Sequence, residues 1–395
     1  MPTTLTFFPV GNGDMAFIKF GDPDSTTLLV DINIRLDADD PKSETRDVAK
    51  DLRERLKKDD QNRPYVDAFL MSHPDEDHCR GLTRHFYLGS PDDYPDDDKP
   101  QKEKRILIRE IWSSPIVFRR RSKTHKLCYE AMEFCTEARR RVKLNRDKDF
   151  VVGDGDRIQI MGEDIDGKTD GLESIVRLVD EDFSTINGKH SDYFKARLLA
   201  PRDHSEDEVL EEELTKNESS VIINFTLAAD QNTPDGAKFL TGGDAEVFIW
   251  NRLWNLHKDS PEVLEYDLME TPHHCSWRTM SNDSWSEKGE DAKVDADARK
   301  ALSQTRSGAI IVASCKPIVD DDDDPPCIRA KREYVAIVKD ASGEFYCTDE
   351  YPNKDNVEPL VFTVTADGFQ PPPKKETGNK AASVITVARS PIEHG

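Results

Sequence analysis

The stretch VDAFLMSHPDEDHCRGL, residues 66–82, decides how this chain folds. Its apolar first part, residues 66–72, predicts a buried strand, because a short apolar run bounded by polar residues is typical of one. The polar loop that follows, SHPDEDH, supplies four candidate metal ligands: His73, Asp75, Asp77 and His78. The first two share one side of an extended turn, and the last two are carried round to a second point. One loop at a strand end can therefore serve two metal ions, because rigid backbone aims its ligands.

Two more ligand clusters stand at the ends of later strands. Asp244 closes the strand FLTGGD, residues 239–244, and is the candidate bridging carboxylate. His273 and His274 follow the strand LMETP, residues 268–272, and can complete the second metal. A hydrolytic metal pair, with ions ~3.5–4 Å apart, needs this mixture of imidazole and carboxylate ligands. An isolated histidine is more often an ordinary core or surface residue, but three such clusters in chain order indicate a shared site.

The rest of the chain reads as short strands and amphipathic helices. A strand hairpin is expected around the GNGD turn, and later strands within residues 219–228, 237–244, 266–274, 309–315, 343–349 and 360–368. The spacing of apolar residues predicts helices within residues 44–57, 127–142 and 247–257. This order of strand, helix and buried strand predicts an α/β sandwich.

We expect one domain over residues 1–369, with insertions at about 90–105, 162–216 and 281–300. A polar, proline-rich linker and tail follow over residues 370–395. Within the tail, the short run VITVARS either pairs at a sheet edge or stays outside the fold. Acidic runs in the insertions are expected to be solvated loops.

The amino-acid composition excludes several classes of protein. The net charge is −23, from 55 Lys and Arg against 78 Asp and Glu, which argues against a protein that coats nucleic acid nonspecifically. No run of about 18 apolar residues and no leader pattern is present, so we expect a soluble protein with no membrane partner. The 7 cysteines form no CxxC pair or regular framework, which predicts reduced thiols and a cytoplasmic location.

Five segments together resemble the metallo-β-lactamase superfamily, and most closely the hydrolase domain of competence proteins of the ComEC type. They are FFPVGNGDMAFIK, TLLVDINI, VDAFLMSHPDEDHCRGL, NESSVIINF with FLTGGDAE, and DLMETPHHCSW. Their order matches the order of the family motifs, and the resemblance spans roughly residues 5–369. It implies an αββα sandwich with insertions and a metal-dependent hydrolase that stands alone without membrane segments.

The resemblance also implies a ligand set. His73 and Asp75 would hold one metal, Asp77 and His78 the other, with Asp244 between them and His273 or His274 on the second. We assign His273 to the metal and His274, with Asp77, to catalysis.

Three departures from the family pattern matter. Asp75 replaces the usual second histidine, and Asn217, Ser219 and Ser220 occupy the stretch where a third-motif histidine would stand. A Pro-Cys pair at residues 326–327 stands where the family often has His-Pro, so a late histidine is missing. His204 could replace that histidine, but it lies in an acidic insertion and is expected to be a solvated loop residue. Carboxylate-rich ligation favours Mn²⁺, or Mg²⁺ at one position, relative to Zn²⁺, so we expect two divalent ions of this group.

The favoured activity is that of a phosphodiesterase or nuclease, in which Asp77 orients a metal-activated water. Basic residues in and just after the helix expected within residues 127–142 support a nucleic-acid substrate, and we expect Arg139, Lys143 and Arg146 to contact it. We also expect substrate contacts from the polar residues at the start of the strand within residues 219–228, which are Asn217, Ser219 and Ser220. The alternative for the basic residues is a solvated face paired with nearby acids.

Two other functions stay open. One is hydrolysis of a small phosphoester or nucleotide signal. The other is a non-catalytic, metal-stabilised subunit that docks a protein partner in a multi-component system, such as a defence locus.

Overall fold

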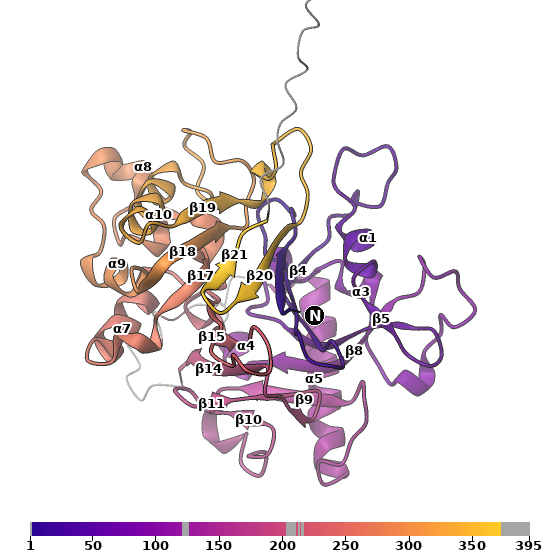
Figure 1. The fold of residues 1–395 in the computed structure, drawn as a ribbon. Helices are drawn as coiled ribbons and strands as arrows, with labels where there is room; N and C mark the ends of the chain where they lie inside the picture. Colours follow the sequence, from indigo (N-terminus) through magenta and orange to yellow (C-terminus); the bar gives the residue numbers. More distant parts are fainter. Residues whose placement is uncertain (1, 121–125, 203–210, 212–213, 215–216, 373–395) are drawn as a thin grey trace, which may run out of the picture.

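The computed structural model describes residues 2–120, 126–202, 211, 214 and 217–372, and two β-sheets dominate it (Figure 1). The first sheet runs in the order β10-β9-β8-β6-β3-β2-β1-β20-β21, with β5 beside β6 and β7 beside β8. The second runs β11-β14-β15-β16-β17-β18-β19. A separate hairpin pairs β12 with β13.

The strands of the first sheet are β1 (Thr4–Phe7), β2 (Ala16–Lys19), β3 (Thr27–Val30), β5 (Lys57–Lys58), β6 (Pro64–Leu70), β7 (Phe86–Tyr87), β8 (Ile106–Ser113), β9 (Arg157–Met161), β10 (Val176–Arg177), β20 (Leu360–Thr365) and β21 (Gly368–Gln370). Those of the second are β11 (Asp182–Phe183), β14 (Phe194–Ala200), β15 (Ile222–Leu227), β16 (Ala237–Leu240), β17 (Tyr266–Glu270), β18 (Thr305–Ala313) and β19 (Glu344–Cys347). The short strands outside these sheets are β4 (Ile32–Asn33), β12 (Thr185–Ile186) and β13 (Lys189–His190).

The helices are α1 (Val48–Arg53), α2 (Glu76–Cys79), α3 (Leu82–His85), α4 (Pro115–Arg119), α5 (Tyr129–Asp147), α7 (Val247–His257), α8 (Trp285–Lys288), α9 (Ala296–Leu302) and α10 (Ile328–Asp340). Figure 1 shows α7, α9 and α10 gathered beside β17, β18 and β19, while α1 and α3 accompany the N-terminal strands. Within the described residues, no helix combines the length and apolar character needed to cross a lipid bilayer.

The core between the sheets explains the layering. One buried cluster takes side chains from the inner faces of both sheets, and the ring of Phe7 meets that of Phe239 edge to face, with centroids 5.9 Å apart. On the outer face of the first sheet, Phe134 of α5 packs on Phe69 of β6, with centroids 5.8 Å apart. On the outer face of the second, Trp250 of α7 joins a third cluster. The expected α/β sandwich is confirmed, with helices on the outer faces of both sheets.

Several expected elements are present with shifted ends, and one expectation was wrong. The helix predicted within residues 127–142 is α5, and the one predicted at residues 247–257 is α7. The expected insertion at residues 162–216 contains β14, a core strand that pairs with β15. Phe194 and Leu198 of β14 are buried between the sheets, so this stretch is only partly an insertion. The tail segment VITVARS lies outside the described residues.

Candidate metal centre

The carboxyl ends of strands from both sheets meet at one edge of the sandwich. In the first sheet, β3 and β6 run parallel, and the loops after them carry Asp31 and residues 72–78. In the second, β16 and β17 run parallel and are followed by Asp244 and the His273-His274 pair. Parallel strands present their carboxyl ends at a common edge, which gathers these loops. The sequence therefore builds one site from both halves of the fold.

Backbone conformations at this edge are unusual. His273 and His274 both have φ of 51°, which lies in the left-handed region that side-chain-bearing residues rarely adopt. Asp31 has φ of 54°. Gly243, with φ of 46°, passes so close to Ser220 that a β-carbon there would lie 2.8 Å from the Cβ of that serine. Strained backbone of this kind concentrates at functional sites, where the surrounding packing maintains it.

Asp244 lies at the centre of the cluster and is almost completely buried. Its Oδ1 atom is 3.1 Å from Nε2 of His78 and 3.4 Å from Nε2 of His274. The two imidazole Nε2 atoms are 3.3 Å apart, and Asp77 reaches Nε2 of His274 at 3.4 Å. This oxygen of Asp244 therefore faces His78 and His274, and Asp77 joins the group through its contact with His274.

The Oδ2 atom of Asp244 faces a second group. It is 3.2 Å from Nε2 of His73 and 3.8 Å from Nε2 of His273. Asp75 lies on the same side, with its Oδ2 atom 3.9 Å from Nε2 of His73. Ligand atoms of His73, Asp75 and Asp244 all lie within 4.8 Å of one another. The two oxygens of one carboxylate thus divide the cluster into two donor sets.

Two further carboxylates lie behind the histidines. Asp31 Oδ2 is 2.9 Å from Nδ1 of His78, and Asp14 Oδ1 is 3.1 Å from Nδ1 of His274. A carboxylate on Nδ1 fixes the tautomer in which Nδ1 carries the proton, so that Nε2 is free to bind a metal. Asp14 also lies near enough to count among donors of the Oδ1 set, but both its contacts go to Nδ1 atoms, which makes it an orienting group.

Asp14 and Asp31 were not among the expected site residues. Both lie in segments that carry the family resemblance, the GNGD turn and TLLVDINI. Their place in these segments is the signal in the sequence that could have identified them as site residues. The turn itself requires glycine, because Gly13 has φ of 148° and a β-carbon there would meet the backbone oxygen of Asp77 at 2.7 Å. The backbone N–H of Asp14 donates to that same oxygen at 3.3 Å, which couples the two loops.

The electrostatics of the cluster favour a cation. Burial disfavours charge on Asp244, yet the surrounding histidines, His73 first, hold its pKa well below the usual range. Burial likewise opposes protonation of His78 and His274, but Asp244 and the carboxylates behind them raise both pKa values well above normal. Burial, with Asp14 and Asp31, raises the pKa of Glu270 well above that of a free carboxyl. Such a concentration of buried carboxylates needs positive charge to balance it.

The donor set fits divalent metal ions. Nε2 of His73 and Oδ1 of Asp244 are buried, and within the described residues neither makes a hydrogen bond. Both atoms are aimed into the cluster, next to the ion-pair partners given above. Imidazole nitrogens suit Zn²⁺, and carboxylates suit Mn²⁺ and Mg²⁺. This buried Asp and His cluster could hold metal ions.

The expected polar contacts Asn217, Ser219 and Ser220 lie beside the cluster but serve the protein itself. Ser220 Oγ accepts a hydrogen bond from the backbone N–H of Asp244 at 3.1 Å, and Ser219 is fully buried. Asn217 donates to Oε1 of Glu246 at 3.2 Å, and that carboxylate lies 3.5 Å from Nδ1 of His273. Burial and the nearby Glu218 raise the pKa of Glu246 to about 7.

The structure does not bring the basic residues of α5 to the cluster. Arg141, on the same stretch of α5, donates to the backbone oxygens of Ile108 and Arg157 near the amino ends of β8 and β9. That end of the strands is opposite to the edge that holds the metal ligands. Arg139 and Lys143 are exposed near this far end, as is Arg146, which donates to the backbone oxygen of Lys168.

A cavity of about 390 Å³ opens directly at the ligand loop. It is lined by Asn12, Pro74, Asp75, Glu76, Asp77, Arg80, Lys126 and Cys128. Lys126 belongs to the basic stretch before α5, whereas Arg119 pairs with Asp164 and Arg120 with Glu211. His204 lies outside the described residues.

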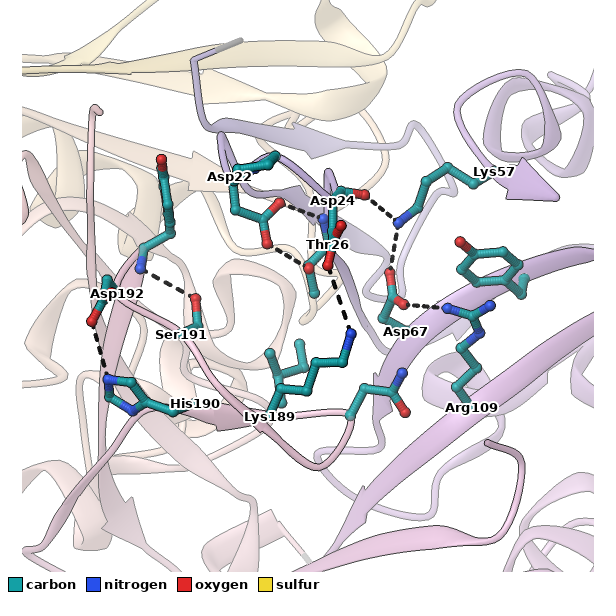
Figure 2. A pocket seen from close by; sticks show the side chains of 15 residues that line it. Asp22, Asp24, Thr26, Lys57, Asp67, Arg109, Lys189, His190, Ser191 and Asp192 are labelled. Carbon is teal, nitrogen blue, oxygen red and sulfur yellow. Dashed lines mark hydrogen bonds and ion pairs between the residues drawn. The ribbon is translucent and has the colours of Figure 1, made fainter. Parts of the chain in front are cut away.

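A second cavity, of about 450 Å³, lies near the amino ends of β6 and β8, away from the ligand edge (Figure 2). Asp67 is one of its lining residues and lies 3.1 Å from Arg109 and 3.4 Å from Lys57. Arg109 also stacks on the ring of Tyr65, 3.4 Å from its centroid. The charges that line this cavity are paired with one another, which is typical of a structural network.

Comparisons with known proteins give distant structural likeness. No family model matches the sequence, and no curated protein matches it. One similar structure is Igni18, described as a novel metallo hydrolase from the hyperthermophilic archaeon Ignicoccus hospitalis, with 9% identity, a TM-score of 0.35, and coverage of 92% of this chain and 100% of that one. Another is a protein of unknown function from Enterococcus faecalis, with 11% identity, a TM-score of 0.27, and coverage of 88% and 77%.

Proposed function

We propose that this protein is a two-metal hydrolase of the metallo-β-lactamase type that cleaves phosphodiesters. The observation that carries the proposal is the position of Asp244, whose two carboxylate oxygens face separate sets of histidine and aspartate donors. A bridging carboxylate between mixed donor sets is what a pair of hydrolytic metal ions needs. The sequence resemblance supports the same assignment independently.

In this proposal both histidines of the His273-His274 pair are ligands, on different ions, so His274 takes a metal-binding role in place of the catalytic role that we assign from the sequence. His274 joins His78 and Asp77 on the Oδ1 side, since its Nδ1 atom is already held by Asp14. His273 joins His73 and Asp75 on the Oδ2 side. There it would take the place of the histidine that the family pattern has in its third motif and that this chain lacks. Two divalent ions held there would supply Lewis-acid activation of a water and of the phosphoryl oxygen.

Asp77 is the proposed catalytic residue. Its side chain is 33% exposed, in contrast to the buried histidines, and it lines the cavity of about 390 Å³. Burial opposes its charge, but His274 and His78 hold its pKa well below the usual range, so the carboxylate is ionised at neutral pH. An ionised carboxylate at the mouth of the site can accept a hydrogen bond from the attacking water and orient it.

The lining of the same cavity supports an anionic substrate. Lys126 and Arg80 line it together with the acidic ligand loop, and these cationic side chains would hold nonbridging oxygens of a phosphodiester. Arg80 also pairs with Glu76 at 3.2 Å, which leaves Lys126 as the cation we expect to meet the substrate first.

The test uses the purified full chain with its metals removed and then restored one at a time. We expect Mn²⁺, and more weakly Mg²⁺ or Zn²⁺, to restore hydrolysis of bis-p-nitrophenyl phosphate and of a single-stranded oligonucleotide. Asp244→Asn should abolish both activities together with binding of at least one ion. Restored metal binding with hydrolysis of neither diester would refute the proposed activity. Activity on the small diester alone would favour the small-phosphoester alternative.

A further inference from the structure

Two cysteines lie in contact beside the metal centre. The Sγ atoms of Cys79 and Cys128 are 3.4 Å apart, although 49 residues separate them in the sequence. Cys79 ends α2, directly after His78, and Cys128 is the N-cap of the 19-residue helix α5. Both thiols are free. Closing this gap to a disulfide bond of about 2.05 Å needs a small movement of two side chains.

The two thiols differ in access and environment. Cys79 is completely buried, while Cys128 is half-buried and lines the cavity that opens at the ligand loop. Cys128 Sγ accepts a hydrogen bond from the backbone N–H of Ala131 at 3.4 Å, as expected for a helix N-cap. The thiol of Cys79, and this helix N-terminus, lower the pKa of Cys128 to about 7 against the opposing effect of burial. A partly exposed thiolate with a shielded partner is the usual arrangement of a reactive and a resolving cysteine.

We propose that Cys79 and Cys128 form a redox modification site, in which a peroxide oxidises Cys128 and Cys79 then closes a disulfide between α2 and α5. Redox-sensing disulfides form where one thiol is accessible and its resolving partner lies beside it, as Cys128 and Cys79 do here.

The chemistry balances with hydrogen peroxide as the oxidant. The Cys128 thiolate attacks one peroxide oxygen, an S–O bond forms, the O–O bond breaks, and hydroxide leaves and takes a proton to become water. The Cys79 sulfur then attacks the sulfenyl sulfur of Cys128, the S–S bond forms, and the S–O bond breaks. The departing hydroxide takes the Cys79 proton to give a second water. Two thiols lose two electrons in total, and one peroxide gains them.

The disulfide would disturb the ligand loop, an effect that rests on the proposed function. In the reduced protein, Cys79 Sγ donates to the backbone oxygen of Asp75 at 3.1 Å. A disulfide sulfur carries no hydrogen, so oxidation removes this bond, and the new S–S bond ties the end of α2, which carries Asp77 and His78, to α5. Loss of a partner of a ligating side chain typically costs 10–100-fold in metal affinity, and because this bond is made to the backbone of the ligand loop, we expect a loss of about 10-fold on oxidation.

The modification site is tested by mass spectrometry on the full chain. Reduced protein is treated with equimolar hydrogen peroxide, free thiols are alkylated, and the unreduced digest is mapped. We expect a Cys79–Cys128 linked peptide that dithiothreitol removes. Cys315 and Cys347, 3.8 Å apart and both buried in the core, are the internal control and should be recovered alkylated after unfolding. Irreversible oxidation of Cys128 without the link, or equal linkage of the control pair, would overturn the proposal.

Coupling to the metals is measured on the same samples. Calorimetric titration with Mn²⁺ should show weaker binding in oxidised wild type and recovery after dithiothreitol, while Cys347→Ser should show the same response as wild type. The linked peptide with unchanged Mn²⁺ affinity would overturn the coupling. If reduced wild type binds no metal while the link still forms, the proposed function fails and the modification site stands.

Discussion

At the level of single residues, the side chains around the buried carboxylate of Asp244 determine what the site can hold. Nε2 atoms of His78 and His274 approach one oxygen of Asp244, and Nε2 atoms of His73 and His273 approach the other. Without cations, the acidic groups of the cluster repel one another and protons must be shared among its histidines. Divalent ions relieve that repulsion and satisfy the Nε2 atoms together, so the same arrangement explains both the charge and the geometry.

Asp77→Asn tests the proposed catalytic residue. The amide keeps the size of the side chain but cannot act as an ionised acceptor, so we expect kcat/KM for a phosphodiester to fall by about 10²-fold or more. Thermal stability should change little, because the side chain lies at the mouth of the site. Steady-state kinetics and calorimetry measure both effects. Glu54→Gln, at the exposed acid that follows α1 as its C-cap, serves as the control, and equal kinetics for the two variants would exclude a catalytic role.

Asp14→Asn tests the orienting carboxylate behind His274. We expect the Mn²⁺ affinity of one site to fall 10–100-fold, since loss of an outer-shell carboxylate has effects of this size. The metal-free protein should be as stable as wild type or more stable, because one buried acid is removed from the neighbourhood of Asp31 and Glu270. Isothermal titration and scanning calorimetry distinguish the two roles. A less stable apoprotein with unchanged metal affinity would mean that Asp14 is purely structural.

At the level of helices and strands, sequence patterns predicted which face of an element is buried. They predicted less well where the element lies relative to the core and to the site. Alternation in FKARLLA places Phe194, Ala196 and Leu198 inward, yet the acidic, turn-rich surroundings concealed β14 inside an expected insertion. The apolar stripe of α5 was readable, but periodicity does not say which end of a helix lies near a site. The pattern of residues also does not show that the His273-His274 pair has left-handed backbone, which turns the two adjacent side chains in directions that an extended strand would not. This is why the sequence assigns only one of the two to a metal.

The position of α5 gives a comparison between two basic regions. Lys143 lies 14 residues beyond the first residue of the helix, or about 21 Å along its axis, whereas Lys126 lines the cavity at the ligand loop. We therefore expect Lys126→Glu to raise KM for an oligonucleotide several-fold and to lower its salt dependence by about one phosphate contact.

The matched control is the triple change of Arg139, Lys143 and Arg146 to Glu. This variant carries more added negative charge than Lys126→Glu, but the charge lies far from the metal ligands. Because physiological salt screens charges at such distances, we expect KM for the oligonucleotide to stay within about twofold of wild type. A larger effect from the triple variant than from Lys126→Glu would restore α5 as the substrate guide. Hydrolysis of the small diester should survive in both variants.

At the scale of the whole molecule, the candidate site joins the two halves of the sandwich. The ligand loop at residues 72–78 follows a strand of the first sheet, and Asp244 with the His273-His274 pair follows strands of the second. Metal ions held between them would link the sheets at one edge, while the inter-sheet core holds the remainder. The fold itself should therefore persist without metal, with lower stability.

Removal of metal by a chelator should lower Tm without loss of secondary structure. An ion that binds only the folded state stabilises it by about 2.7 kcal/mol when its free concentration is 100 times Kd. Scanning calorimetry and circular dichroism on chelated and Mn²⁺-restored protein measure the difference. Wild-type Tm after complete removal of metal would show that no ion links the sheets, and an unfolded apoprotein would show that the core is insufficient alone.

The most direct measurement is a crystal structure of the Mn²⁺-loaded protein with anomalous scattering data. We expect two anomalous peaks about 3.5–4 Å apart, one on each carboxylate oxygen of Asp244. The peak on Oδ1 should contact His78 and His274, and the peak on Oδ2 should contact His73. No anomalous peak at this cluster, or a single ion that Asp244 does not bind, would contradict a two-metal site bridged by Asp244.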